Sequence, residues 1–276
     1  MTRNQENSAS LSWSFVSYGA KVRIDSNSAD ILSEAEAVAR HSLLSNARTV
    51  PFIREPDQLI ELTVSKSKIY RFALNGTYLS SGRSKKKFLK FFDTIIRVSV
   101  AESAKDLVFI HAGVVGWKGR AIIMPGDSFT GKSTLAAALV KNGAEYYSDD
   151  FAIIDGKGLV RAFPRSISMR TDDGNYVPYE LSLDELGGVK GEKHIPVGMI
   201  LFTEYGFRGR WKPKFLTPGQ GIFELIPFVL SLKPQPEFSL KVLNIITKHA
   251  IIASSPRGNA ENFAKTLLSF FDKRLG

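Results

Sequence analysis

The stretch Val108–Asp155, VFIHAGVVGWKGRAIIMPGDSFTGKSTLAAALVKNGAEYYSDDFAIID, decides the fold of this chain of 276 residues. Its centre, Gly126–Ser133, reads GDSFTGKS and matches the phosphate-binding loop pattern G-x-x-x-x-G-K-[ST]. The apolar run Ala121–Met124 predicts a strand before the loop, and Thr134–Asn142 predicts a helix after it. A glycine-rich loop between a buried strand and a helix N-terminus offers backbone N–H groups to phosphate. The sequence therefore predicts an α/β fold built around a phosphate-binding loop.

Two loop side chains have specific expected tasks. Lys132 can reach the β- and γ-phosphates of a nucleotide, and the Ser133 hydroxyl is positioned to hold Mg²⁺. The loop and the first helical residue form the expected nucleotide-binding set: Gly126, Asp127, Ser128, Phe129, Thr130, Gly131, Lys132, Ser133 and Thr134.

The segment Glu145–Ile154 is predicted as the next strand, and it carries Asp149 and Asp150. Neighbouring residues of a strand point to opposite sides, so the two carboxylates should differ in role. One can hold a magnesium ion while the other accepts a proton from an attacking hydroxyl. The alternative is that one of them only caps or solvates the end of the strand.

His111 lies on the predicted strand Leu107–Val115, before the strand that enters the loop. If these two strands pair antiparallel, His111 could reach the end of the sheet where the phosphates bind. A histidine with a purely structural place in the core or at the edge of the sheet is the alternative.

The stretch His111–Asp155 resembles the catalytic domain of HPr kinase/phosphorylase. The shared features are His111-Ala-Gly113, the loop that begins 15 residues later at Gly126, and Ser148-Asp149-Asp150, with Asp149 23 residues after Gly126. The resemblance implies a P-loop kinase domain of the HPr kinase and phosphoenolpyruvate carboxykinase type. It also implies ATP- and Mg²⁺-dependent phosphorylation of a serine-type hydroxyl on a protein or peptide.

The resemblance also assigns roles to residues. Asp149 would be the general base, with His111 as the neighbour that tunes its carboxylate. Lys132 would act on the transferring phosphate, and Asp150 would join Ser133 on the magnesium side. Arg170 and Arg257 are candidates for stabilising the transferring phosphoryl group. Arg257 lies in Pro256–Asn259, which resembles an Arg-Asn element of that family.

The chain departs from the family after the acidic pair. Ile167–Arg170 stands where the family has a Glu-Ile-Arg-Gly-Leu-Gly signature, and it contains neither the Glu nor the glycines. HPr as a substrate, the phosphorylase reaction and a hexameric assembly are therefore not expected. The sequence predicts a diverged member that acts on another protein or peptide.

The net charge of +10 is unevenly distributed. No acidic residue occurs between Lys66 and Phe92, and the eight basic residues there are Lys66, Lys68, Arg71, Arg83, Lys85, Lys86, Lys87 and Lys90. Such a run is typical of a solvated face, and the alternative is docking of an acidic partner segment. The phosphates of a bound nucleotide need only the cations of the loop, so they do not account for this basic run. Nucleic acid is not an expected partner.

Composition excludes several classes of site and location. The chain has no cysteine, which rules out disulfides and Cys-ligated metal centres. Met1–Ser10 is polar, without the apolar core of a secretory signal, and no apolar run approaches the roughly 18 residues of a membrane span. We expect a cytoplasmic protein without a membrane partner, and the sequence leaves a homo-oligomer open.

The chain is expected to divide at residue 105. Residues 1–105 are predicted as an N-terminal mixed α/β region that could dock a substrate, and residues 106–276 as the P-loop kinase catalytic domain. The expected helices are Ser28–Leu44, Ser84–Ala104, Thr134–Asn142, Thr217–Ile226, Phe238–His249 and Asn259–Lys273.

Two other functions fit the same residues. The first is a nucleotide-binding regulatory or assembly module with little catalysis, which needs Lys132, Ser133 and one acid but no base. The second is a kinase of a small hydroxyl metabolite. The pair Asp149 and His111 favours phosphoryl transfer, since only a transferase needs to activate a hydroxyl.

Overall fold

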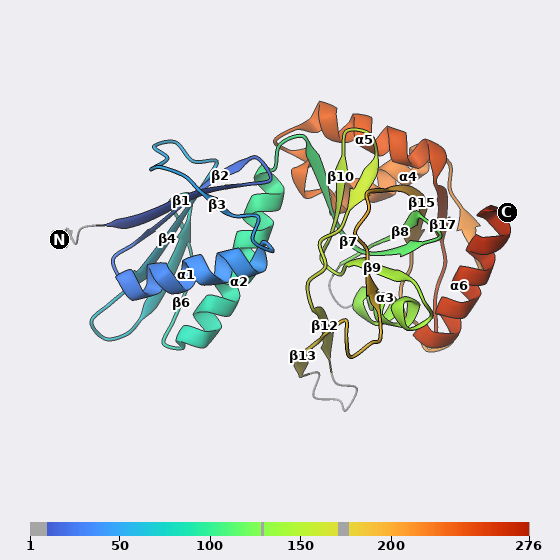
Figure 1. Cartoon of the computed structure of the whole chain (residues 1–276), viewed down its shortest axis with the longest axis horizontal. Helices are drawn as coiled ribbons and strands as arrows, with labels where there is room; N and C mark the ends of the chain where they lie inside the picture. Colours follow the sequence, from blue (N-terminus) through green and yellow to red (C-terminus); the bar gives the residue numbers. More distant parts are fainter. Residues whose placement is uncertain (1–9, 128–129, 171–176, 276) are drawn as a thin grey trace. The chain divides into compact units, whose positions relative to one another are not determined.

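The computed structural model describes residues 10–127, 130–170 and 177–275. The chain separates into two compact units, Met1–Lys105 and Asp106–Gly276, and each has a mixed α/β fold (Figure 1). The α/β class that the sequence predicts is confirmed. Within the described ranges no helix combines the length and the apolar character needed to cross a membrane.

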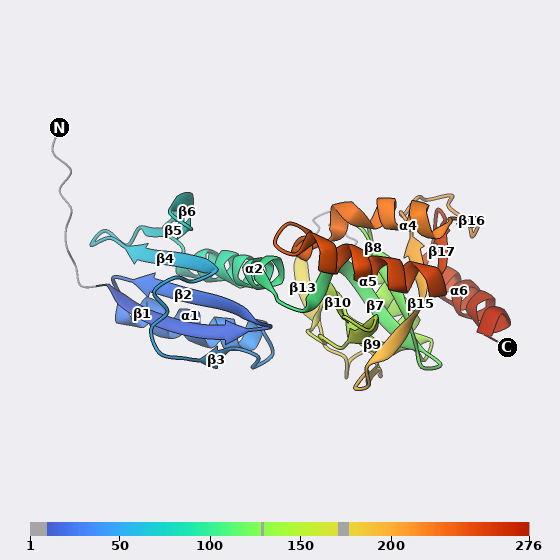
Figure 2. The same cartoon turned by 90° about the horizontal axis from the view of Figure 1, so that it is seen from above.

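The first unit is a six-stranded sheet in the order β3-β1-β2-β4-β5-β6 with two helices (Figure 2). All strand pairs are antiparallel except β2 with β4. The bounds are β1 Leu11–Ser17, β2 Ala20–Ser26, α1 Ala29–Ser42, β3 Arg48–Thr49, β4 Gln58–Val64, β5 Tyr70–Leu74, β6 Thr77–Gly82 and α2 Lys85–Ser103.

Local sequence explains these elements. Buried and more exposed residues alternate along β2 and β4, as expected for strands with one face on a core. Ser28 and Ser84 cap the two helices, each accepting a hydrogen bond from a backbone N–H three residues later. The buried side chains of both helices join those of the sheet in a single core that includes Phe72 and Phe92.

The second unit combines a nine-stranded sheet, a two-stranded hairpin of β12 and β13, and four α-helices. Strands β7, β10, β11, β15 and β8 pair in turn, and β8 pairs again with β7. The strands are β7 Leu107–Trp117, β8 Arg120–Pro125, β9 Glu145–Ser148, β10 Phe151–Asp155, β11 Leu159–Arg161, β12 Ile167–Arg170, β13 Pro178–Leu181, β14 Val189–Lys190, β15 Ile195–Phe202, β16 Lys214–Phe215 and β17 Ile251–Ser254. The helices are α3 Lys132–Lys141, α4 Pro218–Leu225, α5 Pro236–His249 and α6 Ala260–Leu275, with 3₁₀ turns at Ile226–Phe228 and Leu230–Leu232.

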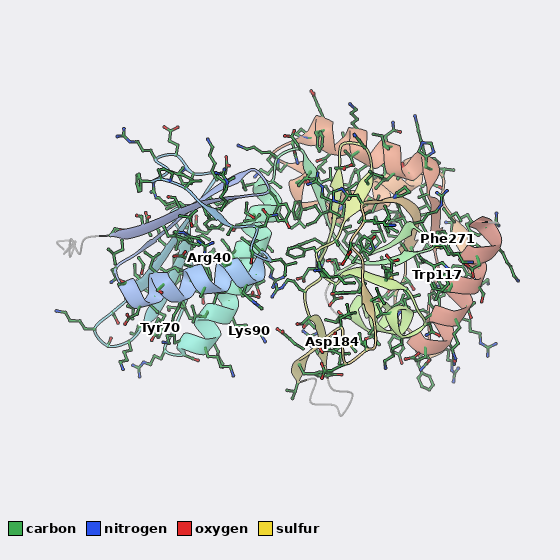
Figure 3. All side chains as sticks on the ribbon, in the orientation of Figure 1. Arg40, Tyr70, Lys90, Trp117, Asp184 and Phe271 are labelled. Carbon is green, nitrogen blue, oxygen red and sulfur yellow. The ribbon has the colours of Figure 1, made fainter. Side chains whose placement is uncertain are left out.

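Strand β8 is buried on both faces, which explains its continuous apolar sequence. Ile122 and Met124 face the core shared with α3 and α6, whereas Ala121 and Ile123 face the core shared with α4 and α5. At the far end of β7, the Trp117 indole N–H donates to Asp272 of α6 at 2.7 Å, and Figure 3 shows Trp117 beside Phe271. The loop that follows β8 therefore begins at the end of a strand that is packed between two layers of helices.

Two details differ from the prediction. The expected single strand Glu145–Ile154 is two strands, β9 and β10, separated by Asp149 and Asp150. The Ser148 hydroxyl accepts the backbone N–H groups of Asp150 and Phe151, at 3.2 and 3.0 Å, and this local turn interrupts the ladder. Helix α3 also begins at Lys132 rather than at Thr134.

Candidate functional site

The loop Gly126–Gly131 joins the end of β8 to the start of α3. Gly131 adopts a left-handed conformation with φ of 82° and forms the N-cap of α3 without a side-chain hydrogen bond. The first N–H groups of the helix are thus not capped by that residue, the arrangement that suits an anion at a helix N-terminus. Ser128 and Phe129, expected members of the nucleotide-binding set, lie outside the described residues.

Lys132 is turned back over the loop. Its side chain is buried, and its Nζ donates to the carbonyl oxygens of Gly126 and Asp127, both at 2.6 Å. Burial lowers the pKa of Lys132, and the nearby carboxylates, Asp149 foremost, oppose that shift. The ammonium group is therefore held inside the loop.

Asp149 lies against the start of α3. The Ser168 backbone N–H donates to its Oδ2 at 3.2 Å, and the Ser133 side chain is hydrogen-bonded to the same carboxyl group. Burial, reinforced by the negative charge of Asp150, raises the pKa of Asp149 to about 7, and these two hydrogen bonds oppose the rise. Its Oδ1 is buried and has no hydrogen-bond partner among the described residues. An oxygen in this state can take a proton or a cation.

Asp150 is half-buried and interacts with Arg165, whose Nη1 lies 3.6 Å from its Oδ2. Its backbone carbonyl contacts the Nδ1 of His111 at 3.0 Å. Burial and the charge of Lys132 lower the pKa of His111, so its ring favours the neutral form. A neutral ring donates this hydrogen bond from Nδ1–H.

Within the described residues, His111 makes no hydrogen bond to the carboxyl group of Asp149, the residue that the family resemblance expects it to tune. Its side-chain hydrogen bond runs to the backbone of Asp150, and the carboxyl group of Asp149 takes its hydrogen bonds from Ser133 and Ser168. The reason is the strand register, because β10 pairs with β7 so that Phe151 lies opposite His111. The histidine fixes the backbone that carries the two acids.

Arg257 reaches the loop from the segment before α6. The residue is buried, and its Nη2 donates to the Gly131 carbonyl at 2.8 Å. Its guanidinium lies 5.3 Å from the ring centre of Tyr205, and burial lowers its pKa. The structure thus brings together Arg257 and the end of the loop, which are 126 positions apart in the sequence.

The remaining expected residues are less enclosed. Thr130 closes the loop through its hydroxyl, which donates to the Asp127 carbonyl at 2.9 Å. Asp127 and Thr134 are exposed. Arg170 is exposed at the end of β12, two residues beyond the Ser168 that contacts Asp149.

Three residues at the site were not predicted from the sequence: Arg165, Ser168 and Tyr146. The Phe163 backbone N–H donates to the Tyr147 carbonyl at 2.8 Å. This hydrogen bond brings the following segment, with Arg165 and Ser168, next to Asp149 and Asp150. The Tyr146 hydroxyl is buried without a hydrogen-bond partner among the described residues, and burial and the charges of Asp149 and Asp150 raise its pKa. No local motif marks these positions, since all three depend on long-range pairing.

The oxygen atoms at the site suit a hard divalent cation. A serine hydroxyl and two carboxylates are ligands that Mg²⁺ accepts when phosphates and water complete its shell. No group of three or more His, Cys, Asp or Glu residues that could hold a metal by itself occurs in the described ranges.

A cavity of about 250 Å³ opens at the start of α6. It is lined by Gly209, Arg210, Trp211, Gly258, Asn259, Asn262, Phe263 and Thr266. Gly258 of the cavity lining directly follows Arg257, whose side chain donates to the Gly131 carbonyl at the end of the loop. The cavity combines an aromatic wall with amide and hydroxyl groups.

The chain matches no protein-family model and no curated protein with which it was compared. Its fold has a distant structural neighbour in the Hpr(Ser) kinase/phosphatase from Coxiella burnetii. The identity is 15%, the TM-score is 0.35, and the match covers 60% of this chain and 97% of that chain. The likeness is remote, so neither the family nor the function of this chain follows from it.

Proposed function

We propose that this protein is an ATP- and Mg²⁺-dependent kinase that phosphorylates a serine-type hydroxyl of a protein or peptide. One observation carries the proposal: Asp149 is half-buried beside Ser133 at the start of α3, its Oδ1 is buried without a hydrogen-bond partner among the described residues, and its pKa is raised to about 7. A general base works best when its pKa lies near the working pH. A module that only binds a nucleotide has no need of such a base.

Each residue has a part in the proposed reaction. The loop N–H groups and Lys132 bind the phosphates, with the Lys132 ammonium exchanging its contacts with the Gly126 and Asp127 carbonyls for phosphate oxygens. Asp149 accepts the proton of the acceptor hydroxyl as that oxygen forms a bond to the γ-phosphorus. The bond from this phosphorus to the β–γ bridging oxygen breaks, and ADP leaves.

Ser133 and Asp150 are the proposed magnesium-side residues. When bound, the ion supplies positive charge that offsets the negative charge of the phosphates. Arg165 holds the Asp150 carboxylate from one side, and His111 holds the backbone of Asp150 from the other. Arg257 keeps Gly131 in position through its carbonyl, which makes it a positioning residue in this proposal.

The nucleoside would occupy the cavity at the start of α6. Trp211 offers a flat surface for a purine ring, and Asn259 and Asn262 offer amide groups. The connection through Arg257 to Gly131 supports this arrangement, because base and phosphates must be bound on neighbouring parts of one site. Exposed Arg170 is the proposed contact for the transferring group or for the acceptor segment.

Exchange of Asp149 for Asn tests the function. With ³²P-labelled ATP and protein extract as acceptor, Asp149→Asn should lower the transfer rate by about 10²-fold or more, since it removes the base. Nucleotide affinity should stay within a few-fold, because Lys132 and the loop are unchanged. Lys132→Ala, the comparison variant, should instead lose nucleotide affinity.

The magnesium dependence separates the two roles that Asp149 could have. If Asp149 is the base, the rate of the wild-type protein rises with pH through about pH 7, and Asp149→Asn leaves the magnesium requirement unchanged. If Asp149→Asn instead recovers full activity at high magnesium concentration, Asp149 holds the metal. Label that appears only in small metabolites, or full activity in Asp149→Asn, contradicts the proposal.

A further inference from the structure

A group of cations surrounds one end of the β5–β6 hairpin in the first unit. Lys66 and Lys68 lie in the turn before β5, and Arg83 follows the end of β6. The strand register places Gly82 opposite Tyr70, so the end of β6 and the start of α2 lie at the same end of the sheet as that turn. We call this group the β6 cations, and its members are Lys66, Lys68, Arg71, Arg83, Lys86, Lys87 and Lys90.

The β6 cations are exposed and lack acidic partners. All seven side chains are exposed, and none makes an ion pair within the described ranges. The neighbouring Lys85 differs, since its Nζ pairs with Glu34 of α1 at 2.7 Å. Lys90, labelled in Figure 3, lies on α2.

Stability does not explain Lys86 and Lys87 in the first turn of α2. The first turn of α2 contains Lys85, Lys86 and Lys87 and no acidic residue. A helix N-terminus carries partial positive charge, so cations there are unfavourable and acids are favourable. Residues that break a local rule without a structural gain are expected at a functional surface.

Strand β6 is the last strand of its sheet and pairs only with β5. Its sequence, TYLSSG, has no charged residue and no proline, two of the features that commonly block an exposed edge, and a register shift next to Leu79 makes its pairing with β5 irregular. Tyr78 and Leu79 are 60% and 41% exposed. The edge therefore offers backbone groups and two apolar side chains to another extended chain.

We propose that the first unit binds an extended acidic peptide segment, which adds as a strand to the edge of β6. Backbone hydrogen bonds to β6 would hold the segment, and its carboxylates would pair with the β6 cations. A folded nucleic acid or a lipid surface would use the cations but not the strand edge. This binding goes beyond the proposed kinase function and does not require a nucleotide.

The direct test uses the full-length chain and a fluorescein-labelled peptide of alternating Glu and Val. Fluorescence anisotropy should show saturable binding that weakens with added salt. The same peptide with every backbone nitrogen methylated keeps its charge but cannot donate to an edge strand, and it should bind at least about tenfold more weakly. Lys132→Ala should bind the peptide as the wild-type protein does, even if it cannot bind ATP.

Charge reversal on α2 tests the surface. Lys86→Glu/Lys87→Glu/Lys90→Glu should weaken peptide binding about tenfold or more, while acids near the helix N-terminus keep the fold stable. The matched control is Lys241→Glu/Lys248→Glu/Lys265→Glu, which changes the charge equally at exposed lysines of the second unit and should bind as wild type.

Several outcomes would overturn the inference. Equal binding of the methylated peptide would mean that charge alone acts, without strand addition. An equal loss in the two triple variants would mean that net charge matters and the surface does not. Tighter binding of a uridine oligonucleotide or of phosphatidylserine vesicles than of the peptide would assign the cations to a different partner.

Discussion

At the scale of single residues, the site depends on one carboxyl group that is kept from water. Two opposing sets of interactions act on the pKa of Asp149. Burial and the charge of Asp150 disfavour the ionised carboxylate, while Ser133, Ser168 and Lys132 favour it. Burial prevails, and the pKa rises to about 7 from the ordinary value of 3.8. A carboxyl group in this state accepts a proton near neutral pH.

This raised pKa has a consequence for stability. In the unfolded chain Asp149 ionises near pH 4, but in the folded protein it stays protonated up to about pH 7. The unfolded state therefore binds fewer protons between these values, so the free energy of unfolding should fall as pH rises from about 4 to 7. Above pH 7 the cost is at most about 4 kcal/mol.

Asp149→Asn should remove this cost. The variant should be more stable than the wild-type protein at pH 8 and similar to it at pH 4, in thermal unfolding followed by circular dichroism. The control is Asp184→Asn, an exposed carboxyl group labelled in Figure 3, which should show no such pH-dependent gain. If Asp149→Asn unfolds at lower temperature than wild type at pH 8, the native carboxylate is stabilised by its surroundings and the expected sign is wrong.

At the scale of elements, the loop between β8 and α3 is held by a residue from another part of the chain. Gly131 has φ of 82°, which L side chains rarely adopt, and a Cβ at this position would lie 1.9 Å from the Arg257 Nη2. The buried position of Arg257 therefore depends on the absence of a side chain at residue 131. The order of the loop depends on the segment before α6 as well as on its own glycines.

Gly131→Ala should damage the loop in two ways. Backbone strain costs about 1–2 kcal/mol at a left-handed position, and the contact with Arg257 is lost in addition. Gly119→Ala is the matched control, because Gly119 has φ of 74° in the β7–β8 turn and nothing lies within 4 Å of its added Cβ. Urea unfolding and nucleotide binding should both show a larger loss for Gly131→Ala. Equal losses in the two variants would mean that the arginine contact contributes nothing.

At the scale of the whole molecule, each unit has its own hydrophobic core among the described residues. The core of the first unit uses residues from Trp13 to Val100, and the two cores of the second use residues from Val108 to Phe271. Each unit thus buries its apolar side chains by itself, which is the condition for independent folding.

Fragments 10–105 and 106–276 should each fold when produced alone. Each should unfold cooperatively in a thermal scan, and fragment 106–276 should bind a nucleotide if the loop functions as proposed. The matched control is a pair of fragments divided at Gly143, inside the second unit, which should not fold because the cut separates α3 from α6. A fragment 106–276 without a cooperative transition would contradict this independence.

Local sequence signals predicted most of the helices and the position of the loop. The α/β class, the strand before the loop and most of the helices follow from apolar periodicity, serine caps and the GDSFTGKS pattern, because these signals act over a few residues. Small strands such as β11 and β14 were not predicted, since their two or three residues carry no periodicity.

Which side chains meet at the loop follows from long-range packing, which no local sequence pattern predicts. The approach of Arg257 to Gly131, of Arg165 to Asp150 and of Ser168 to Asp149 depends on chain return and strand register. The same register places the hydrogen bond of His111 on the backbone of Asp150, whereas the family resemblance suggested the carboxylate of Asp149. Burial is likewise a property of the packed chain, and it is burial that raises the pKa of Asp149 and lowers that of Lys132.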